Sequence, residues 1–165
     1  APSASAYTYG GSFTVKAGDA NGEIADVNKA VDLETDAKKK SSILYKIATI
    51  YSKSNKSTSR NYAQKAINAE GSNGRAYLLI AHLYASSANE CGTTAFEKRA
   101  VYWKAAEMAR QAGRVDPALS SRASQAAESY SAKAPTKTDI FNSGMAGKTI
   151  SFSCWVGGSI KVPNL

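Results

Sequence analysis

The stretch Gln64–Ala85, QKAINAEGSNGRAYLLIAHLYA, gives the clearest indication of the fold of this chain of 165 residues. It predicts the end of one helix, a polar break at Gly71–Gly74, and the start of a second helix. Apolar and small residues of the second helix recur at spacings of three and four, which places them on one stripe: Tyr77, Ile80, Ala81 and Tyr84. The stretch therefore predicts two consecutive helices.

A short pattern of this stretch occurs three times along the chain. Each copy is an apolar residue, a small residue and a tyrosine three positions later: Ile47-Ala48-x-x-Tyr51, Ile80-Ala81-x-x-Tyr84 and Ala126-Ala127-x-x-Tyr130. The first two tyrosines lie 33 residues apart, and the last two lie 46 apart because of an insertion. Small residues let two helices approach closely, and the aromatic ring fills the groove beside them. The spacing predicts repeated helix pairs; an unrelated helical bundle is the alternative.

This pattern resembles the tetratricopeptide repeat, a helix–turn–helix unit of about 34 residues. The second helix of that motif and its terminating proline match a further set: Ala105, Ala109, Ala112 and Asp116-Pro117. Other segments look like one group of bacterial envelope tetratricopeptide proteins: Cys91-Gly92, Val101-Tyr102-Trp103, Asp116-Pro117, Pro135–Phe141 and Cys154-Trp155. The resemblance covers roughly Ala30 to Val162. It implies architecture and a place outside the bacterial cell or on its surface, with no catalytic activity.

We therefore expect a mainly α-helical fold of about two and a half antiparallel tetratricopeptide-type pairs, with a strand-like N-terminal arm and a C-terminal β-hairpin. Residues 1–22 are predicted to form the arm, 23–134 the helical repeats, and 135–165 a plug and the hairpin. The predicted helices are Glu23–Leu33, Ser41–Lys53, Ser59–Glu70, Arg75–Ser87, Phe96–Gly113 and Pro117–Ala132. Ile140 and Phe141 are expected to plug the end of the stack.

The N-terminal region carries a strand pattern in front of half a repeat. Tyr7-Thr8-Tyr9 and Phe13-Thr14-Val15 alternate apolar and polar residues around Gly10-Gly11. Exposure of aromatic side chains to water is unfavourable in free energy, so an arm that packs against the protein is favoured over a flexible N-terminal segment. Ile24 and Val27 begin a helix whose partner helix is missing, and this apolar face needs a cover.

The C-terminal stretch Lys148–Val162 changes to a period of two, and Gly157-Gly158 predicts the turn of a hairpin. Counting back across a two-residue turn places Ile160 opposite Trp155 and Val162 opposite Ser153. One face then carries Ile150, Phe152, Cys154 and Val156, and the other carries Trp155, Ile160 and Val162. Both faces are therefore predicted to need cover.

The sequence contains none of the common catalytic or metal-binding motifs. It has one histidine, His82, and no metal-binding HExxH, phosphate loop or CxxC motif, so we expect no enzyme, cofactor or metal. Two cysteines permit one bridge, Cys91–Cys154, with two free thiols as the alternative. The formal charge of +8 comes from scattered residues, which favours a solvated surface over a nucleic-acid site. No apolar run reaches the ~18 residues of a membrane span.

Two functions remain open. The first is a structural protein, secreted or on the surface of a bacterium, that binds other copies of itself head to tail to form a filament. Its expected interface joins the arm, the half repeat and the hairpin: Tyr7, Tyr9, Phe13, Val15, Ile24, Val27, Trp155, Ile160 and Val162. The alternative is a monomeric tetratricopeptide module that binds a partner peptide or a cell-surface glycan. The start Ala1-Pro2 suits a terminus left by a signal peptidase.

Overall fold

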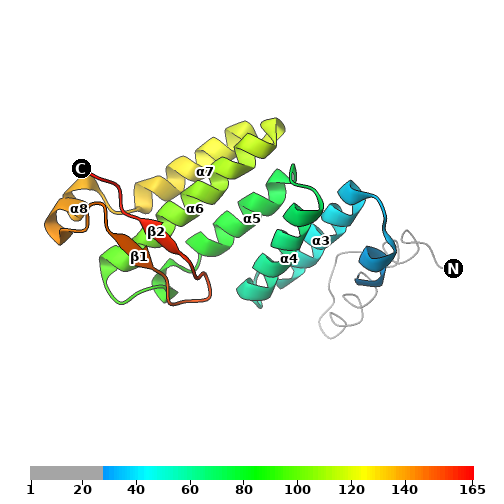
Figure 1. Cartoon of the computed structure of the whole chain (residues 1–165), viewed down its shortest axis with the longest axis horizontal. Helices are drawn as coiled ribbons and strands as arrows, with labels where there is room; N and C mark the ends of the chain where they lie inside the picture. The colour runs from blue at the N-terminus through cyan, green and yellow to red at the C-terminus, as the bar shows by residue number, and fades with distance from the viewer. Residues whose placement is uncertain (1–27) are drawn as a thin grey trace. The chain divides into compact units, whose positions relative to one another are not determined.

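The computed structural model describes residues 28–165, which are mainly helical and end in a small antiparallel hairpin (Figure 1). These residues belong to two compact units, one that ends at Ala76 and one that begins at Tyr77. The arm predicted over residues 1–22 lies outside the described residues, as do Ile24 and Val27. Their role in an interface stays a prediction.

The first unit contains a helical segment at residues 28–33, α3 (Ala37–Tyr51) and α4 (Lys56–Ala69). Asp36 caps α3, because its carboxylate accepts from the Lys39 N–H at 3.0 Å. This cap starts the helix four residues earlier than the apolar stripe predicts. The Asn55 side chain caps α4 in the same way and marks the short turn between the helices.

The helices α3 and α4 pack side by side along their length (Figure 1). Ala48, Ala63 and Ala66 are fully buried, and their short side chains allow the close approach. Two buried hydroxyls also join the helices, each through a bond of 2.6 Å. Ser41 Oγ donates to the Ala66 carbonyl, and Ser59 Oγ donates to the Ala48 carbonyl. The predicted helix pair is therefore present, with polar anchors that the periodicity does not reveal.

The second unit contains most of the remaining helices and the hairpin. Its elements in chain order are α5 (Gly74–Ala85, which begins just before the boundary), η1 (Ala88–Glu90), α6 (Ala95–Val115), η2 (Pro117–Leu119), α7 (Ser120–Lys133), α8 (Lys137–Ser143), β1 (Thr149–Ser151) and β2 (Ser159–Lys161). Ala81, Ala109 and Ala127, one from each of α5, α6 and α7, form a buried cluster. The small residues of the predicted stripes thus supply a core of this unit.

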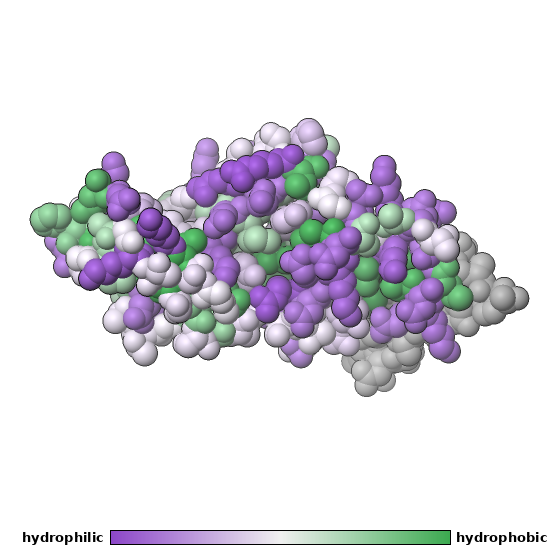
Figure 2. Space-filling view, in the orientation of Figure 1, coloured by the Kyte–Doolittle hydropathy of each residue, from purple (hydrophilic) through white to green (hydrophobic). Residues whose placement is uncertain are grey.

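The short helix α8 departs from the predicted plug. Ile140 is 3% exposed and packs into the unit, as expected, but Phe141 is 73% exposed. Consecutive helical residues point in directions about 100° apart, so one of the two faces water. Figure 2 shows hydrophobic side chains over α8. The prediction that Phe141 plugs the end of the stack is therefore wrong.

The hairpin lies where the alternation predicts it, but its register differs. Ile150 pairs with Ile160, and Thr149 pairs with Lys161, so the connection is longer than two residues. Ile150, Phe152, Ile160 and Val162 therefore share one face, while Thr149, Ser151, Ser159 and Lys161 are exposed on the other. The predicted pairing of Ile160 with Trp155 is wrong, and so is the expectation of two apolar faces.

Candidate functional site

The hairpin loop is tied covalently to the segment that follows α5. Cys91 at the end of η1 and Cys154 in the loop form a disulfide with Cα atoms 5.0 Å apart, which confirms the predicted bridge. Cys91 is buried. The bridge ties the hairpin loop to the segment between η1 and α6.

Trp155, next to the bridge, turns back onto the end of α5. Its indole N–H donates to the Ser87 hydroxyl at 2.9 Å, and its ring centroid lies 5.7 Å from that of Tyr84. A tryptophan with a buried hydrogen-bond partner is held by the large ring area that it buries and by the direction of its indole N–H bond. Trp155 therefore belongs to the loop and not to a strand, which explains the register.

Lys104 of α6 fixes the far end of the loop. Its ammonium donates to the Gly157 carbonyl at 2.8 Å and lies 5.6 Å from the ring centre of Tyr84 and 5.7 Å from that of Phe152. Gly158 adopts a φ of +66°, and a Cβ there would lie 2.5 Å from Lys104 Nζ. The left-handed backbone favours glycine at this position, and a side chain here would displace the end of Lys104 from the Gly157 carbonyl.

The three hairpin residues that the sequence predicts for an interface differ in their exposure to solvent. Val162 is 0% exposed, Trp155 is half-buried against Ser87 and Tyr84, and Ile160 is partly exposed. The side chain of Val162 thus serves the interior of this unit. What the hairpin offers to a partner is its backbone and its polar face.

Both outer edges of the hairpin carry unpaired backbone groups. The Phe152 N–H donates to the Gly158 carbonyl at 3.0 Å, and the Val162 N–H donates to the Lys148 carbonyl at 2.8 Å, so these are hydrogen-bonded pairs. Narrow and wide pairs alternate in an antiparallel ladder. The N–H and C=O groups of the intervening pairs therefore point outward: Thr149 with Lys161, and Ser151 with Ser159. Sequence reasoning missed these edges because they depend on the register.

Arg99 near the start of α6 joins the ends of two further helices. It forms an ion pair with Asp139 at 2.9 Å and donates to the carbonyls of Lys133 and Ala134 at 3.1 Å. The backbone N–H of Thr136 and its hydroxyl, with the nearby Arg99 charge, hold the pKa of Asp139 below its ordinary value. No local sequence signal marks Arg99, because its partners lie 34 or more residues away.

A second capping carboxylate lies where α6 begins. The backbone N–H groups of Thr93 and Thr94 and the Thr93 hydroxyl hold the pKa of Glu97 below its ordinary value. Thr94 in turn accepts from the Glu97 N–H, which completes a capping box. Both carboxylates with a lowered pKa thus lie at the start of a helix, where their hydrogen bonds stabilise the first turn.

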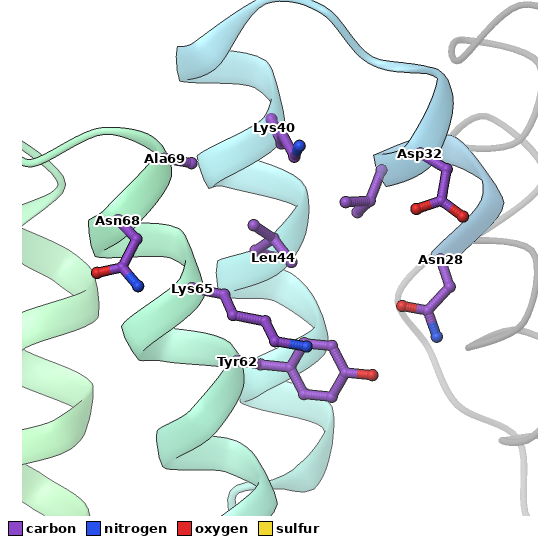
Figure 3. A pocket seen from close by; sticks show the side chains of 9 residues that line it. Asn28, Asp32, Lys40, Leu44, Tyr62, Lys65, Asn68 and Ala69 are labelled. Carbon is purple, nitrogen blue, oxygen red and sulfur yellow. The ribbon is translucent and has the colours of Figure 1, made fainter.

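The first unit contains a groove of about 420 Å³ between residues 28–33, α3 and α4 (Figure 3). Its walls mix polar and apolar side chains: Asn28, Val31, Asp32, Lys40, Leu44, Tyr62, Lys65, Asn68 and Ala69. Lys65 Nζ lies 5.0 Å from the ring centre of Tyr62, which itself stacks on Tyr51 at 5.8 Å. Figure 3 shows Asn28 and Asp32 across the groove from this pair.

The second unit contains a more polar groove of about 330 Å³ beside η1. His82 of α5, Tyr102 of α6, and Tyr130 and Lys133 of α7 are among the residues that line it. Lys133 Nζ lies 5.7 Å from the ring centre of Tyr102, and burial raises the pKa of Tyr130. These groups offer hydrogen bonds and positive charge to a polar ligand.

Residues 28–165 contain no group of three or more His, Cys, Asp or Glu side chains placed to hold a metal ion. No helix in this range is both long enough and apolar enough to cross a membrane.

The chain matches no known family model, no curated protein and no solved structure.

Proposed function

We propose that this chain is a non-enzymatic structural protein of the bacterial exterior. In this proposal, tetratricopeptide-type helix pairs form a scaffold, and copies associate head to tail through the N-terminal arm of one and the hairpin of the next. The single observation that carries the proposal is the hairpin with its outward backbone groups at Thr149, Ser151, Ser159 and Lys161. Exposed strand edges are templates for pairing with another chain.

Two further observations, the disulfide and an exposed aromatic side chain, support the proposal. The hairpin is held firmly by the Cys91–Cys154 bridge, so it is a rigid acceptor. Disulfides persist in oxidising environments, which suits a protein outside the cell. Exposed Phe141 adds an apolar contact on the same unit.

The helix pairs themselves support the scaffold. The helices α3 and α4 are joined by a four-residue turn, pack through small residues, and carry the repeated motif at Ile47, Ala48 and Tyr51. In α5 the same motif supplies Ile80 and Ala81, which are buried. Stacked repeats have open ends, and a contact between different ends of two copies continues as a filament unless it closes into a ring.

Deletion of Ala1–Lys16 tests the proposal. We expect the shortened chain to lose assembly, as measured by multi-angle light scattering and negative-stain microscopy, while its helical circular dichroism stays unchanged. A sharper variant replaces Tyr7, Tyr9 and Phe13 by serine, and its matched control replaces Thr8 and Thr14 by serine. Unchanged oligomer size for both the deletion and the aromatic variant would refute the proposal.

A second candidate function is the binding of a partner peptide or a cell-surface glycan by a monomer. The groove of Figure 3 favours it, because Lys40 and Lys65 offer charge beside the apolar side chains of Val31 and Leu44. Titration with acidic peptides and anionic polysaccharides by calorimetry tests this function, with Lys65→Gln as the variant and Lys53→Gln as the control. Equal binding by both variants, or none at low salt, contradicts it.

A further inference from the structure

We propose that the outer edge of β1, and not that of β2, accepts the stretch Tyr7–Val15 of a second copy as a third strand. This inference rests on the proposed self-association and assigns it to one side of the hairpin. It also predicts which substitutions of the hairpin block assembly and which leave it unchanged.

The two edges differ in the side chains that accompany their outward backbone groups. On β2 the exposed Lys161 lies at the edge, and Pro163 follows directly after Val162. Charged side chains, lysine above all, and proline are the residues that protect an edge from pairing with another strand. The edge of β2 therefore carries the features of a strand that is kept unpaired.

The exposed Lys148 directly precedes β1, but its carbonyl is bonded inward to the Val162 N–H, and β1 itself contains neither a charged residue nor a proline. Its exposed residues are Thr149 and Ser151, which are small and uncharged, and threonine favours extended backbone. Their N–H and C=O groups have no partner in the ladder, since the register turns them outward. This edge offers two donors and two acceptors to an incoming strand.

The stretch Tyr7–Val15 fits this edge chemically. It contains no charged residue, and Lys16 follows it. Its alternation places Tyr7 and Tyr9 on one side and Thr8 on the other. An added strand then extends the face of Ile150 and Phe152 with its tyrosines and sets Thr8 beside Thr149 and Ser151. Backbone bonds supply affinity in this mode of recognition, and the alternating side chains supply specificity.

Proline tests the assignment because it deletes one N–H. In Thr149→Pro the lost N–H points outward, so the β1–β2 ladder keeps its bonds. The matched control is Lys161→Pro, the cross-strand partner, which loses an outward N–H on the other edge. In the full chain we expect Thr149→Pro to weaken assembly about tenfold or more by light scattering, and Lys161→Pro to change it less than about twofold. Equal effects, or the reverse order, overturn the assignment.

A second pair avoids any effect of proline on folding. Ser151 and Ser159 face each other across the ladder, so Ser151→Lys and Ser159→Lys place the same charge on opposite edges. We expect only Ser151→Lys to reduce assembly, with unchanged circular dichroism and an intact disulfide by mass spectrometry. Equal loss in both variants contradicts the inference.

A competition experiment identifies the incoming segment. A synthetic peptide of residues 6–16, added in excess to the full chain, should dissolve the assemblies, and the same peptide with Tyr7, Tyr9 and Phe13 replaced by serine should not. If the wild-type chain assembles while both Thr149→Pro and Ser151→Lys assemble equally well, only the edge assignment fails. If the wild-type chain stays monomeric at every concentration, the proposed function fails with it.

Discussion

The pair α3–α4 and the C-terminal hairpin are held in place by opposite kinds of contact. The helices meet along their length through alanines, and the buried Ser41 and Ser59 bond to carbonyls 25 and 11 residues away. The hairpin has only three-residue strands, and its position depends on partners far away in sequence. Its disulfide spans 63 residues, and the Trp155–Ser87 bond spans 68.

The two regions therefore depend on different contacts for their stability. A helix pair with a short turn has mostly local contacts, so it forms from its own segment. A two-stranded hairpin is marginal by itself in water and needs support from elsewhere. We therefore expect the stability of the hairpin to depend mainly on the disulfide and on side chains distant in sequence. The stability of the α3–α4 pair should depend mainly on small residues and buried hydroxyls.

Removal of the disulfide should have the largest effect. In Cys91→Ser with Cys154→Ser, the unfolded chain regains the freedom of a loop of 63 residues, so the free energy of unfolding should fall by about 4 kcal/mol. Trp103 and Trp155 are the two tryptophans and both lie after Tyr77, so their fluorescence in urea reports this unit. Amide exchange in α3 and α4 is the control and should stay unchanged. Equal loss of protection in α3 and α4 would contradict the division between the regions.

Truncation of two neighbouring residues in α8 should lower the stability of the second unit by very different amounts. Ile140 is buried, so Ile140→Ala should lower the free energy of unfolding of the second unit by about 3 kcal/mol. Phe141→Ala removes a larger side chain that is 73% exposed and should cost less than about 0.5 kcal/mol. Urea unfolding followed by tryptophan fluorescence measures both. Similar losses would show that Phe141 is covered in solution, for instance by another copy.

The two regions also differ in how far the sequence predicts them. The stripe of Leu44, Ile47 and Ala48 predicts α3 correctly, since helical periodicity is a local property. The disulfide and the place of the hairpin were predicted as well. The register was not, because the two glycines suggested a tight turn while Cys154 and Trp155 are drawn to distant partners. The open edges of Thr149 and Ser151 follow only from that register.

A buried hydroxyl tests the helix pair with a smaller change. Ser59→Ala keeps the volume and removes the bond from the hydroxyl to the Ala48 carbonyl, so the first unit should lose about 1 kcal/mol of stability. Amide exchange in α3 and α4 measures this loss without interference from the second unit. Ser42→Ala, at an exposed position of α3, is the matched control and should change exchange very little. If Ser59→Ala left the stability of the first unit unchanged, the alanine contacts alone would set the close approach of the two helices.

The smallest expected effect is a pH dependence at the start of α6. The pKa of Glu97 is lower in the folded state than in the unfolded chain. The ionised carboxylate therefore stabilises the fold at pH values above the pKa of the unfolded chain, and this stabilisation is lost as the pH falls through the pKa of the folded state. Between pH 5 and 3 the wild type should therefore lose stability that Glu97→Gln, which lacks the titrating group, does not. We expect a difference of about 0.5 kcal/mol, the size expected for a solvent-screened carboxylate in the first turn of a helix.

Urea unfolding by tryptophan fluorescence at several pH values measures this difference, with Glu107→Gln as the control. Glu107 is exposed in the middle of the same helix, where backbone N–H groups are already paired along the helix, so its replacement should leave the slope of stability against pH close to that of the wild type. If Glu107→Gln flattened the slope as much as Glu97→Gln, general charge repulsion and not the capping box would cause the dependence. Because Thr93 and Thr94 follow directly after Cys91-Gly92, the cap also fixes the chain next to the disulfide. Even this local contact therefore supports the region whose stability depends on distant partners.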